Sequence, residues 1–194
     1  MRVKYLKGAG FLSISFRKEI KDLKPYKPGK PIDDVKREYG LDRVVKLASN
    51  ENPLGCSEKA KEAIKNALDN LSLYPDGNTT ILKEALAKKL NIGTDEVLPS
   101  SGADEMIDLI SRTFVSKDDE VIMADITFPR YIATTKIMGG TPVIVPLKDL
   151  TYDLDGMLEK ITDKTKVIWL CNPNNPTGTI VTKDEVLAFL DEVP

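Results

Sequence analysis

Hydrophobic and polar positions follow a helical period in the first half of the chain. Two segments repeat apolar residues every three or four positions, which predicts amphipathic helices at 57–70 and about 81–90, with Ser57 as the cap of the first. A loop rich in Pro, Asp and Gly separates them. A shorter helix is expected at 32–39, where Gly40 ends it.

From residue 96 onward, short apolar runs alternate with helical patterns. The runs are rich in β-branched residues and nearly continuous in apolar character, which is typical of strands covered on both faces. We expect strands at 96–99, 120–124, 142–147 and 166–171. We expect helices from Ala103 or Asp104, at 130–138, at 155–162 and after Thr182. This order predicts an α/β fold with a mainly parallel sheet, helices on both faces and right-handed crossovers.

The domain organisation follows from the same patterns. Residues 1–45 are charged and partly Pro-rich, and we expect them to form an N-terminal arm before one domain at 46–194. The last helical pattern has no strand after it, although each earlier helix of the alternating section leads to a further strand. We therefore expect an incomplete domain. A secretory signal in the first sixteen residues is a weaker alternative, because Ser13 and Ser15 interrupt its apolar run.

Composition excludes several classes of function. The 194 residues include 28 Lys and Arg, 30 Asp and Glu and no His, so the net charge of −2 offers no surplus of positive charge for nucleic acid. No segment reaches the roughly 18 uncharged apolar residues that a membrane crossing needs. Without His, the usual triad and zinc chemistries are absent, and we expect no metal. The distant Cys56 and Cys171 favour a reducing, cytoplasmic setting.

Two loops that follow strands have the composition of ligand-binding segments. The segment 100–105, SSGADE, opens a helix, so its backbone N–H groups can face an anion; an ordinary helix start capped by Ser101 or Asp104 is the alternative. The segment 171–179, CNPNNPTGT, combines prolines that fix the backbone with asparagines that donate and accept hydrogen bonds. A plain turn is the alternative there.

Two other loops are weaker indications of a ligand-binding site. Phe128, in the segment ITFPRY at 126–131, also follows a strand and would be able to stack on a planar ring, although an aromatic residue in that place more often fills the core. The segment LASNENPLG at 47–55 is polar and, by itself, is a hinge loop between the arm and the domain.

Taken together, five segments resemble the fold-type I, pyridoxal-phosphate-dependent aminotransferases in order and spacing. They are KLASNENPLG (46–55), LYPDG (73–77), SSGADE (100–105), FPRY (128–131) and CNPNNPTGT (171–179). The resemblance covers about residues 20–194, and it is greatest to the histidinol-phosphate aminotransferase family. It implies that residues 46–194 are part of a pyridoxal-phosphate-binding large domain.

The resemblance also implies pyridoxal 5'-phosphate as the cofactor and gives roles to the residues that match. Ala103 and Asp104 would donate backbone N–H groups to the cofactor phosphate. Phe128 would stack on the pyridine ring, where relatives often have Tyr. Asn175 would donate a hydrogen bond to the 3-oxygen of the ring.

Three more residues receive roles from the resemblance. Tyr74 would reach the cofactor phosphate of a partner subunit, which implies a homodimer with shared sites. Tyr26 and Asn50 would lie near the substrate, with the arm folded over the pocket.

The resemblance implies amino transfer between glutamate or 2-oxoglutarate and the histidinol-phosphate pair, in histidine biosynthesis in the cytoplasm. The Schiff-base lysine of the family follows the CNPNNPTGT segment, in sequence not printed here, so we expect the 194-residue chain alone to be inactive. Ser116-Lys117 is expected at the far end of a helix, roughly 18 Å from the phosphate. Two alternatives stay open: another aminotransferase or decarboxylase of the same subfamily, and a non-catalytic α/β fragment.

Overall fold

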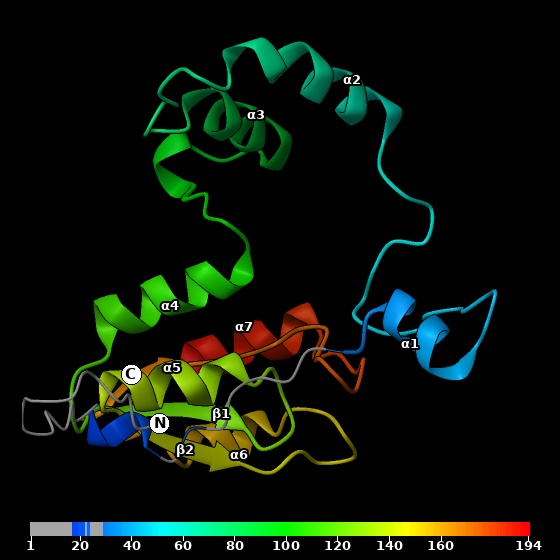
Figure 1. Ribbon diagram of the computed structural model, residues 1–194. Helices are drawn as coiled ribbons and strands as arrows, with labels where there is room; N and C mark the ends of the chain where they lie inside the picture. Colours follow the sequence, from blue (N-terminus) through cyan, green and yellow to red (C-terminus); the bar gives the residue numbers. More distant parts are fainter. Residues whose placement is uncertain (1–16, 22, 24–28) are drawn as a thin grey trace, which may run out of the picture. The chain divides into compact units, whose positions relative to one another are not determined.

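The computed structural model describes residues 17–21, 23 and 29–194 (Figure 1). By their contacts, the residues divide into two compact units, one formed by Lys24–Pro99 and the other by Ser100–Pro194 together with Met1–Leu23. The boundary expected between residues 45 and 46 lies inside the first of these units. Tyr26 lies outside the described residues, so its expected place near the substrate stays a prediction.

The unit formed by Lys24–Pro99 is helical. Its elements are α1 (Ile32–Tyr39), α2 (Glu58–Ala67), the short 3₁₀ helix η2 (Leu68–Asn70), α3 (Thr80–Leu90) and η3 (Thr94–Glu96). Gly40 ends α1 as expected, with a left-handed φ of 62° and its N–H bonded to the carbonyl of Lys36. Ser57 is the N-cap residue of α2, but its side chain makes no capping hydrogen bond with the described residues.

The strand expected at 96–99 is wrong. Residues 94–96 form η3, and Val97 is extended but belongs to no sheet of the described chain. An extended segment becomes a strand only when a neighbouring strand takes up its backbone N–H and C=O groups, and the apolar pattern alone does not reveal that neighbour. Among the described residues of this unit, Ala87 alone is buried.

The second unit alternates strands and helices. After the 3₁₀ helix η1 (Lys18–Ile20), its elements are α4 (Ala103–Phe114), β1 (Glu120–Ala124), α5 (Arg130–Met138), β2 (Thr141–Val145), α6 (Leu154–Leu158), β3 (Thr165–Ile168) and α7 (Lys183–Glu192). The sheet has the order β2-β1-β3, and both neighbours of β1 are parallel to it. The predicted α/β class with a parallel sheet is confirmed.

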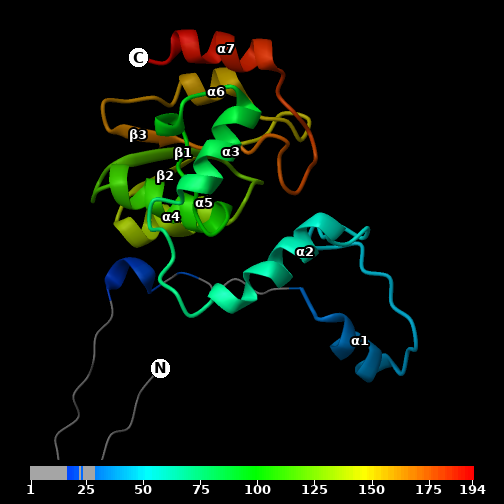
Figure 2. The same cartoon turned by 90° about the horizontal axis from the view of Figure 1, so that it is seen from above.

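Helices cover both faces of this sheet, and β1 is its centre. Ile122 and Ala124 point to one face, where they pack in one cluster with Met157 of α6 and Phe189 of α7. Val121 and Met123 point to the other face and pack with α4 and α5. Figure 2 shows α6 and α7 on one side of the strands and α4 and α5 on the other. The near-continuous apolar run of β1 is therefore explained by burial on both faces.

The strand β3 ends at Ile168, three residues before the predicted end, because the backbone beyond it stops pairing with β1. Trp169 still donates its N–H to the carbonyl of Ile122, at 2.9 Å. Two residues later, the N–H of Cys171 donates to the hydroxyl of Tyr152 at 3.0 Å and no longer to a strand. The strand pairing thus ends where the ligand-type loop begins.

The central strand supplies a test of this core. We expect Ile122→Ala to lower the free energy of unfolding by about 3 kcal/mol, because Ile122 is 0% exposed and a buried side chain of this size leaves a cavity that its surroundings fill only in part. The matched control is Ile144→Ala on β2, where the side chain is 41% exposed and the expected loss is below about 1 kcal/mol. Denaturant unfolding of both variants measures the difference. Equal losses would contradict this description of the core.

Candidate functional site

Three sequence-predicted segments meet at one edge of the sheet. The loops 125–129 and 169–182 leave the carboxyl ends of the parallel strands β1 and β3. The start of α4 lies at the same edge, because Asp104 Oδ1 is 2.9 Å from Nε of Arg130, the first residue of α5. The amide-bearing bend before α4 and the asparagine loop therefore face a common region, as ligand sites of parallel sheets do.

Asn174 joins two of these loops. It is 3% exposed, and its side-chain oxygen accepts a hydrogen bond from the Thr127 hydroxyl at 2.9 Å. Its side-chain nitrogen donates to the carbonyl of Ile126 at 3.0 Å and to the hydroxyl of Thr177 at 2.8 Å. The amide is thus fully used inside the protein, and it fixes the loop after β3 against the loop after β1.

The other two asparagines of the loop differ from each other. Asn172 forms a closed pair with the backbone of Val181, donating to its carbonyl at 2.9 Å and accepting from its N–H at 3.1 Å. Asn175 is half-buried, and its side-chain amide has no hydrogen-bond partner within the described part of the chain. Of the three, Asn175 has the side chain that remains available to a ligand.

A line of hydroxyl groups extends the same network to a third loop. The hydroxyls of Tyr152 and Thr127 are 2.6 Å apart. Because the single proton of Thr127 goes to Asn174, Tyr152 donates to Thr127 and accepts from the N–H of Cys171. Burial raises the pKa of the Tyr152 phenol, and the hydrogen bond that it accepts from the N–H of Cys171 offsets only part of that effect. The phenol is therefore protonated at neutral pH, as the donor role requires.

Phe128 is held by an aromatic stack on the α4 and α5 face of the sheet. Its ring meets Tyr131 edge to face, with 5.9 Å between the ring centroids, and Tyr131 stacks on Trp169 at 4.7 Å. Burial raises the pKa of the Tyr131 phenol, and the neighbouring Cys171 adds to the shift. Phe128 itself is half-buried, so core packing fixes part of the ring and leaves part of it accessible.

The start of α4 is open to an anion. Gly102, with a φ of 90°, precedes the helix, and no side chain of the described residues caps it; a capping role for Ser101 or Asp104 is therefore wrong. A Cβ at Gly102 would meet nothing within 4 Å. Ala103 and Asp104 are exposed, and N–H groups of a first helical turn have no acceptor inside the helix. Asp153 and Thr182 cap α6 and α7 with their side chains, whereas α5, like α4, has no side-chain cap.

Tyr74 and Asn50 belong to the Lys24–Pro99 unit. Tyr74 is fully exposed. Asn50 is exposed in a turn, with a left-handed φ of 51°. Their expected roles stay predictions. The Ser116-Lys117 pair follows the last residue of α4, and the Lys117 side chain is largely exposed, as expected for a solvated lysine.

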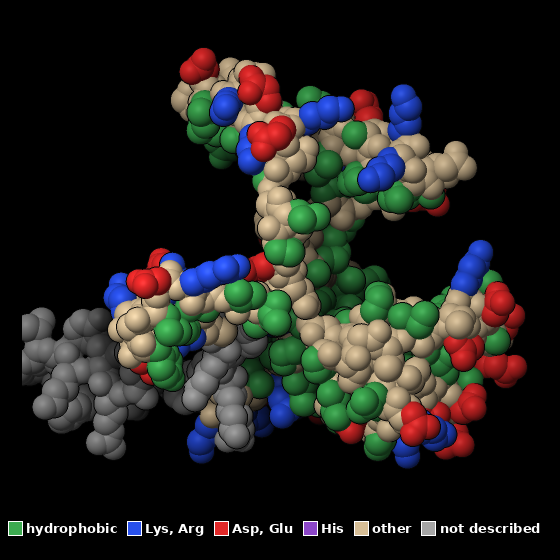
Figure 3. All heavy atoms as spheres, turned by 90° about the vertical axis from the view of Figure 1, so that its right-hand side faces the viewer, with side chains coloured by type: hydrophobic (Ala, Val, Ile, Leu, Met, Phe, Trp, Pro, Cys, Tyr) green, Lys and Arg blue, Asp and Glu red, His purple; other side chains and the backbone are tan. Residues whose placement is uncertain are grey.

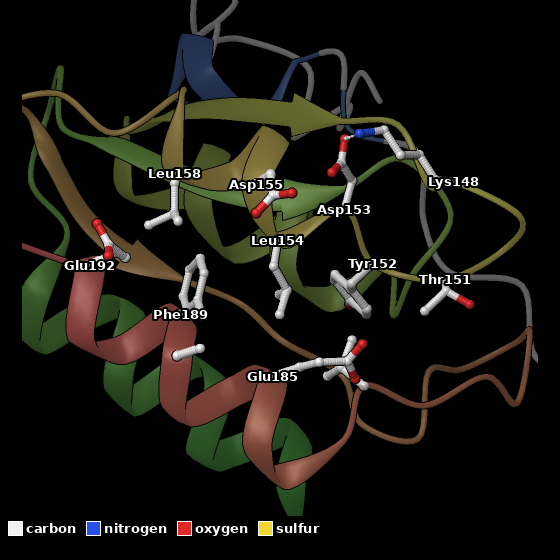
Figure 4. Close-up of a pocket in the computed structure, with 12 residues that line it drawn as sticks. Lys148, Thr151, Tyr152, Asp153, Leu154, Asp155, Leu158, Glu185, Phe189 and Glu192 are labelled. Carbon is white, nitrogen blue, oxygen red and sulfur yellow. Dashed lines mark ion pairs between the residues drawn. The ribbon is translucent and has the colours of Figure 1, made fainter.

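A separate cavity of about 450 Å³ lies between α6 and α7 (Figure 4). Lys148 Nζ and Asp153 Oδ2 form an ion pair at 2.8 Å beside it, which lowers the pKa of Asp153 and raises the pKa of Lys148. Its floor includes Leu154 and Phe189. None of the ligand-binding residues predicted from the sequence lines this cavity.

Sequence reasoning missed the roles of Thr127, Tyr152 and Asn174. Their side chains join residues that are 19 to 48 positions apart in the sequence, and no spacing rule predicts such pairs. The available signal was indirect, since polar residues directly follow the predicted strands. Within residues 17–21, 23 and 29–194, no helix combines the length and apolar character needed to cross a bilayer.

Comparisons with known proteins agree with this geometry. A family model described as aminotransferase class I and II matches residues 42–194. Histidinol-phosphate aminotransferases from Caldicellulosiruptor saccharolyticus and Bacillus subtilis are 56% and 49% identical to the chain, and each alignment covers 92% of this chain and 50% of the relative. The chain thus spans about half the length of the curated relatives it matches.

Solved structures give the same result. The histidinol-phosphate aminotransferase from Sinorhizobium meliloti, in complex with pyridoxal-5'-phosphate, aligns with a TM-score of 0.81 and 26% identity, over 92% of this chain and 48% of that chain. An alanine aminotransferase from Pyrococcus furiosus aligns with a TM-score of 0.65 and 28% identity, over 73% of this chain and 38% of that one.

The two adjacent asparagines provide a test of the loop. We expect Asn174→Ala to lower the free energy of unfolding by about 2 to 3 kcal/mol, because it leaves buried partners unsatisfied. Asn175→Ala is the matched control and is expected to change stability by less than about 0.5 kcal/mol. Thermal or denaturant unfolding of both variants measures the contrast. A large loss for Asn175→Ala would mean that its side chain has a structural partner.

Proposed function

The chain belongs to the class I and II aminotransferases, and on this premise we propose that it forms the phosphate- and ring-binding part of a histidinol-phosphate aminotransferase that uses pyridoxal phosphate. The proposal rests above all on one observation. Three loops, tied together by Asn174 and by the Asp104–Arg130 pair, direct an uncapped helix start and the unpartnered amide of Asn175 to one edge of the sheet.

The helix start suits the phosphate group. Phosphate accepts several hydrogen bonds and carries negative charge, and the first turn of a helix offers N–H donors with a favourable dipole. Ala103 and Asp104 are exposed there, and the space above Gly102 is open. We assign their backbone N–H groups to the cofactor phosphate.

The loops 125–129 and 169–182 suit an aromatic ring that bears an oxygen. Phe128 would cover one face of the ring, since its own position is fixed by Tyr131. Asn175 would donate its amide N–H to the 3-oxygen and favour the negatively charged form of that oxygen. When bound, pyridoxal phosphate supplies an electron sink for the charge that develops on the substrate carbon during amino transfer.

The substrate assignment follows from the relatives. Curated relatives that are 44% to 56% identical to the chain are named histidinol-phosphate aminotransferases, and we propose the same amino transfer, between glutamate and the histidinol-phosphate pair, for the protein that contains this chain. We place it in the cytoplasm, in histidine biosynthesis. A substrate panel on the full-length protein, with histidinol phosphate, aromatic amino acids and threonine phosphate, tests this assignment. A preference for either of the last two would overturn it.

We also propose that the protein is a homodimer whose two sites share residues. Tyr74 would contact the phosphate bound by the partner subunit. The Lys24–Pro99 unit supports this, because large apolar side chains of its described residues are exposed. They include Leu47, Leu54, Leu71, Leu73 and Ile81. Figure 3 shows apolar side chains among the charged ones around α2 and α3. Burial against a second copy would remove such surface from water.

Cofactor binding can be tested on the chain itself. Pyridoxine 5'-phosphate is a suitable probe, because it lacks the aldehyde that reacts with surface lysines. We expect the chain to bind it at least about tenfold more tightly than pyridoxine, and Asn175→Ala to weaken binding about fivefold through the loss of one hydrogen bond. Asn66→Ala, an exposed substitution on α2, is the control and should bind as wild type does. Titration calorimetry measures the affinity of the wild-type chain for each probe and the affinity of each variant for pyridoxine 5'-phosphate. Equal affinity of the wild-type chain for the two probes would refute the phosphate site.

Shared sites predict complementation between two defective subunits. In the full-length protein, we expect Tyr74→Ala and Asn175→Ala each to reduce activity. In randomly mixed dimers of the two variants, half the dimers would contain one intact site, so about one quarter of the wild-type activity should return. Activity assays after co-expression measure this. Tyr39→Ala, also exposed in the same unit, is the control. No recovery in verified mixed dimers would refute site sharing.

A further inference from the structure

The proposed phosphate site contains an unfavourable charge. Asp104 is the second residue of α4, so its carboxylate lies in the same turn as the N–H groups assigned to the phosphate. The Asp104 side chain is 59% exposed, so its carboxylate is not enclosed by the protein. Two negative charges a few ångströms apart repel each other even near the protein surface. An unpaired Asp104 would therefore weaken phosphate binding.

Arg130 offsets this charge. Its Nε lies 2.9 Å from Asp104 Oδ1, and its side chain is only 32% exposed. The pair joins the first turn of α4 to the first turn of α5, so it also links the helix start to the loop that carries Phe128. The other acid of the turn, Glu105, is directed to the backbone N–H of Ser101. Among the described residues, Arg130 is thus the cation paired with Asp104; the contact is an ion pair by distance, and its angle does not make Nε a hydrogen-bond donor to the carboxylate.

We propose that Arg130 is a positioning residue of the phosphate site, which holds the Asp104 carboxylate toward α5 and neutralises its charge. A phosphate monoester can then use the backbone N–H groups of Ala103 and Asp104 without facing an unpaired carboxylate. This inference rests on the proposed function, since it concerns the same site. It adds Arg130 as a residue that affects the binding of the phosphate group and not the binding of the pyridine ring.

The experiment compares pyridoxine 5'-phosphate with pyridoxine on the 194-residue chain and four variants. We expect Arg130→Gln to weaken binding of the phosphorylated probe about fivefold and to leave pyridoxine binding unchanged. Arg130→Lys keeps the charge and should stay within about twofold of wild type. In the Arg130→Gln, Asp104→Asn double variant, affinity should return to near wild type, because the repelling charge is gone and the backbone donor remains.

The matched control is Arg112→Gln. Arg112 pairs with Asp108 at 2.7 Å on the same helix, two turns beyond Asp104, so this variant removes a comparable ion pair away from the helix start. We expect it to bind both probes as wild type does. Circular dichroism and thermal unfolding verify that every variant is folded.

The outcomes separate this inference from the proposed function. A wild-type chain that does not prefer the phosphorylated probe would refute both. If the wild-type chain shows the expected preference, two results would refute the role of Arg130 and leave the phosphate site intact. In one, Arg130→Gln binds both probes as wild type does; in the other, it loses affinity for both probes equally. A double variant as weak as Arg130→Gln alone would also overturn it, because Arg130 would then contact the phosphate directly.

Discussion

The buried side-chain amide of Asn174 is the interaction on which the arrangement of the loops depends. It accepts from Thr127 and donates to Ile126 and Thr177, so one side chain connects the segments that leave two neighbouring strands. A buried amide is stable only when each of its groups has a partner. Its geometry therefore constrains both loops at once, and the position of Asn175 next to it follows from that constraint.

The sheet makes this arrangement possible, because it brings the ends of β1 and β3 side by side. Burial on both faces anchors β1, because Ile122 and Ala124 pack in one cluster and Val121 and Met123 pack in the other. Tyr152, Thr127 and Asn174 then form one directed line of hydrogen bonds across three loops. A rigid sheet thus positions the loops that carry the polar side chains of the candidate site.

Much of the second unit was predictable, because its signals are local. Strand 120–124, helix 130–138 and the helix after Thr182 were expected from periodicity and capping, and they are present. The strand expected at 96–99 failed because a strand depends on a neighbour that periodicity does not report. The loop sequences indicated a ligand site, but they did not distinguish Asn175 from Asn172 and Asn174. That distinction comes from partners that are distant in sequence.

The groups that we propose to face the ligand have no hydrogen-bond partner within the described part of the chain. Inside the unit, Asn172, Asn174, Thr127 and Tyr152 are satisfied by neighbouring groups, and the starts of α6 and α7 are closed by capping side chains, whereas those of α4 and α5 are not. The uncapped start of α4 and the amide of Asn175 depart from this pattern at the same edge. Water can satisfy these donors until an anionic ligand replaces it, so this edge can take up a ligand without breaking a hydrogen bond inside the protein.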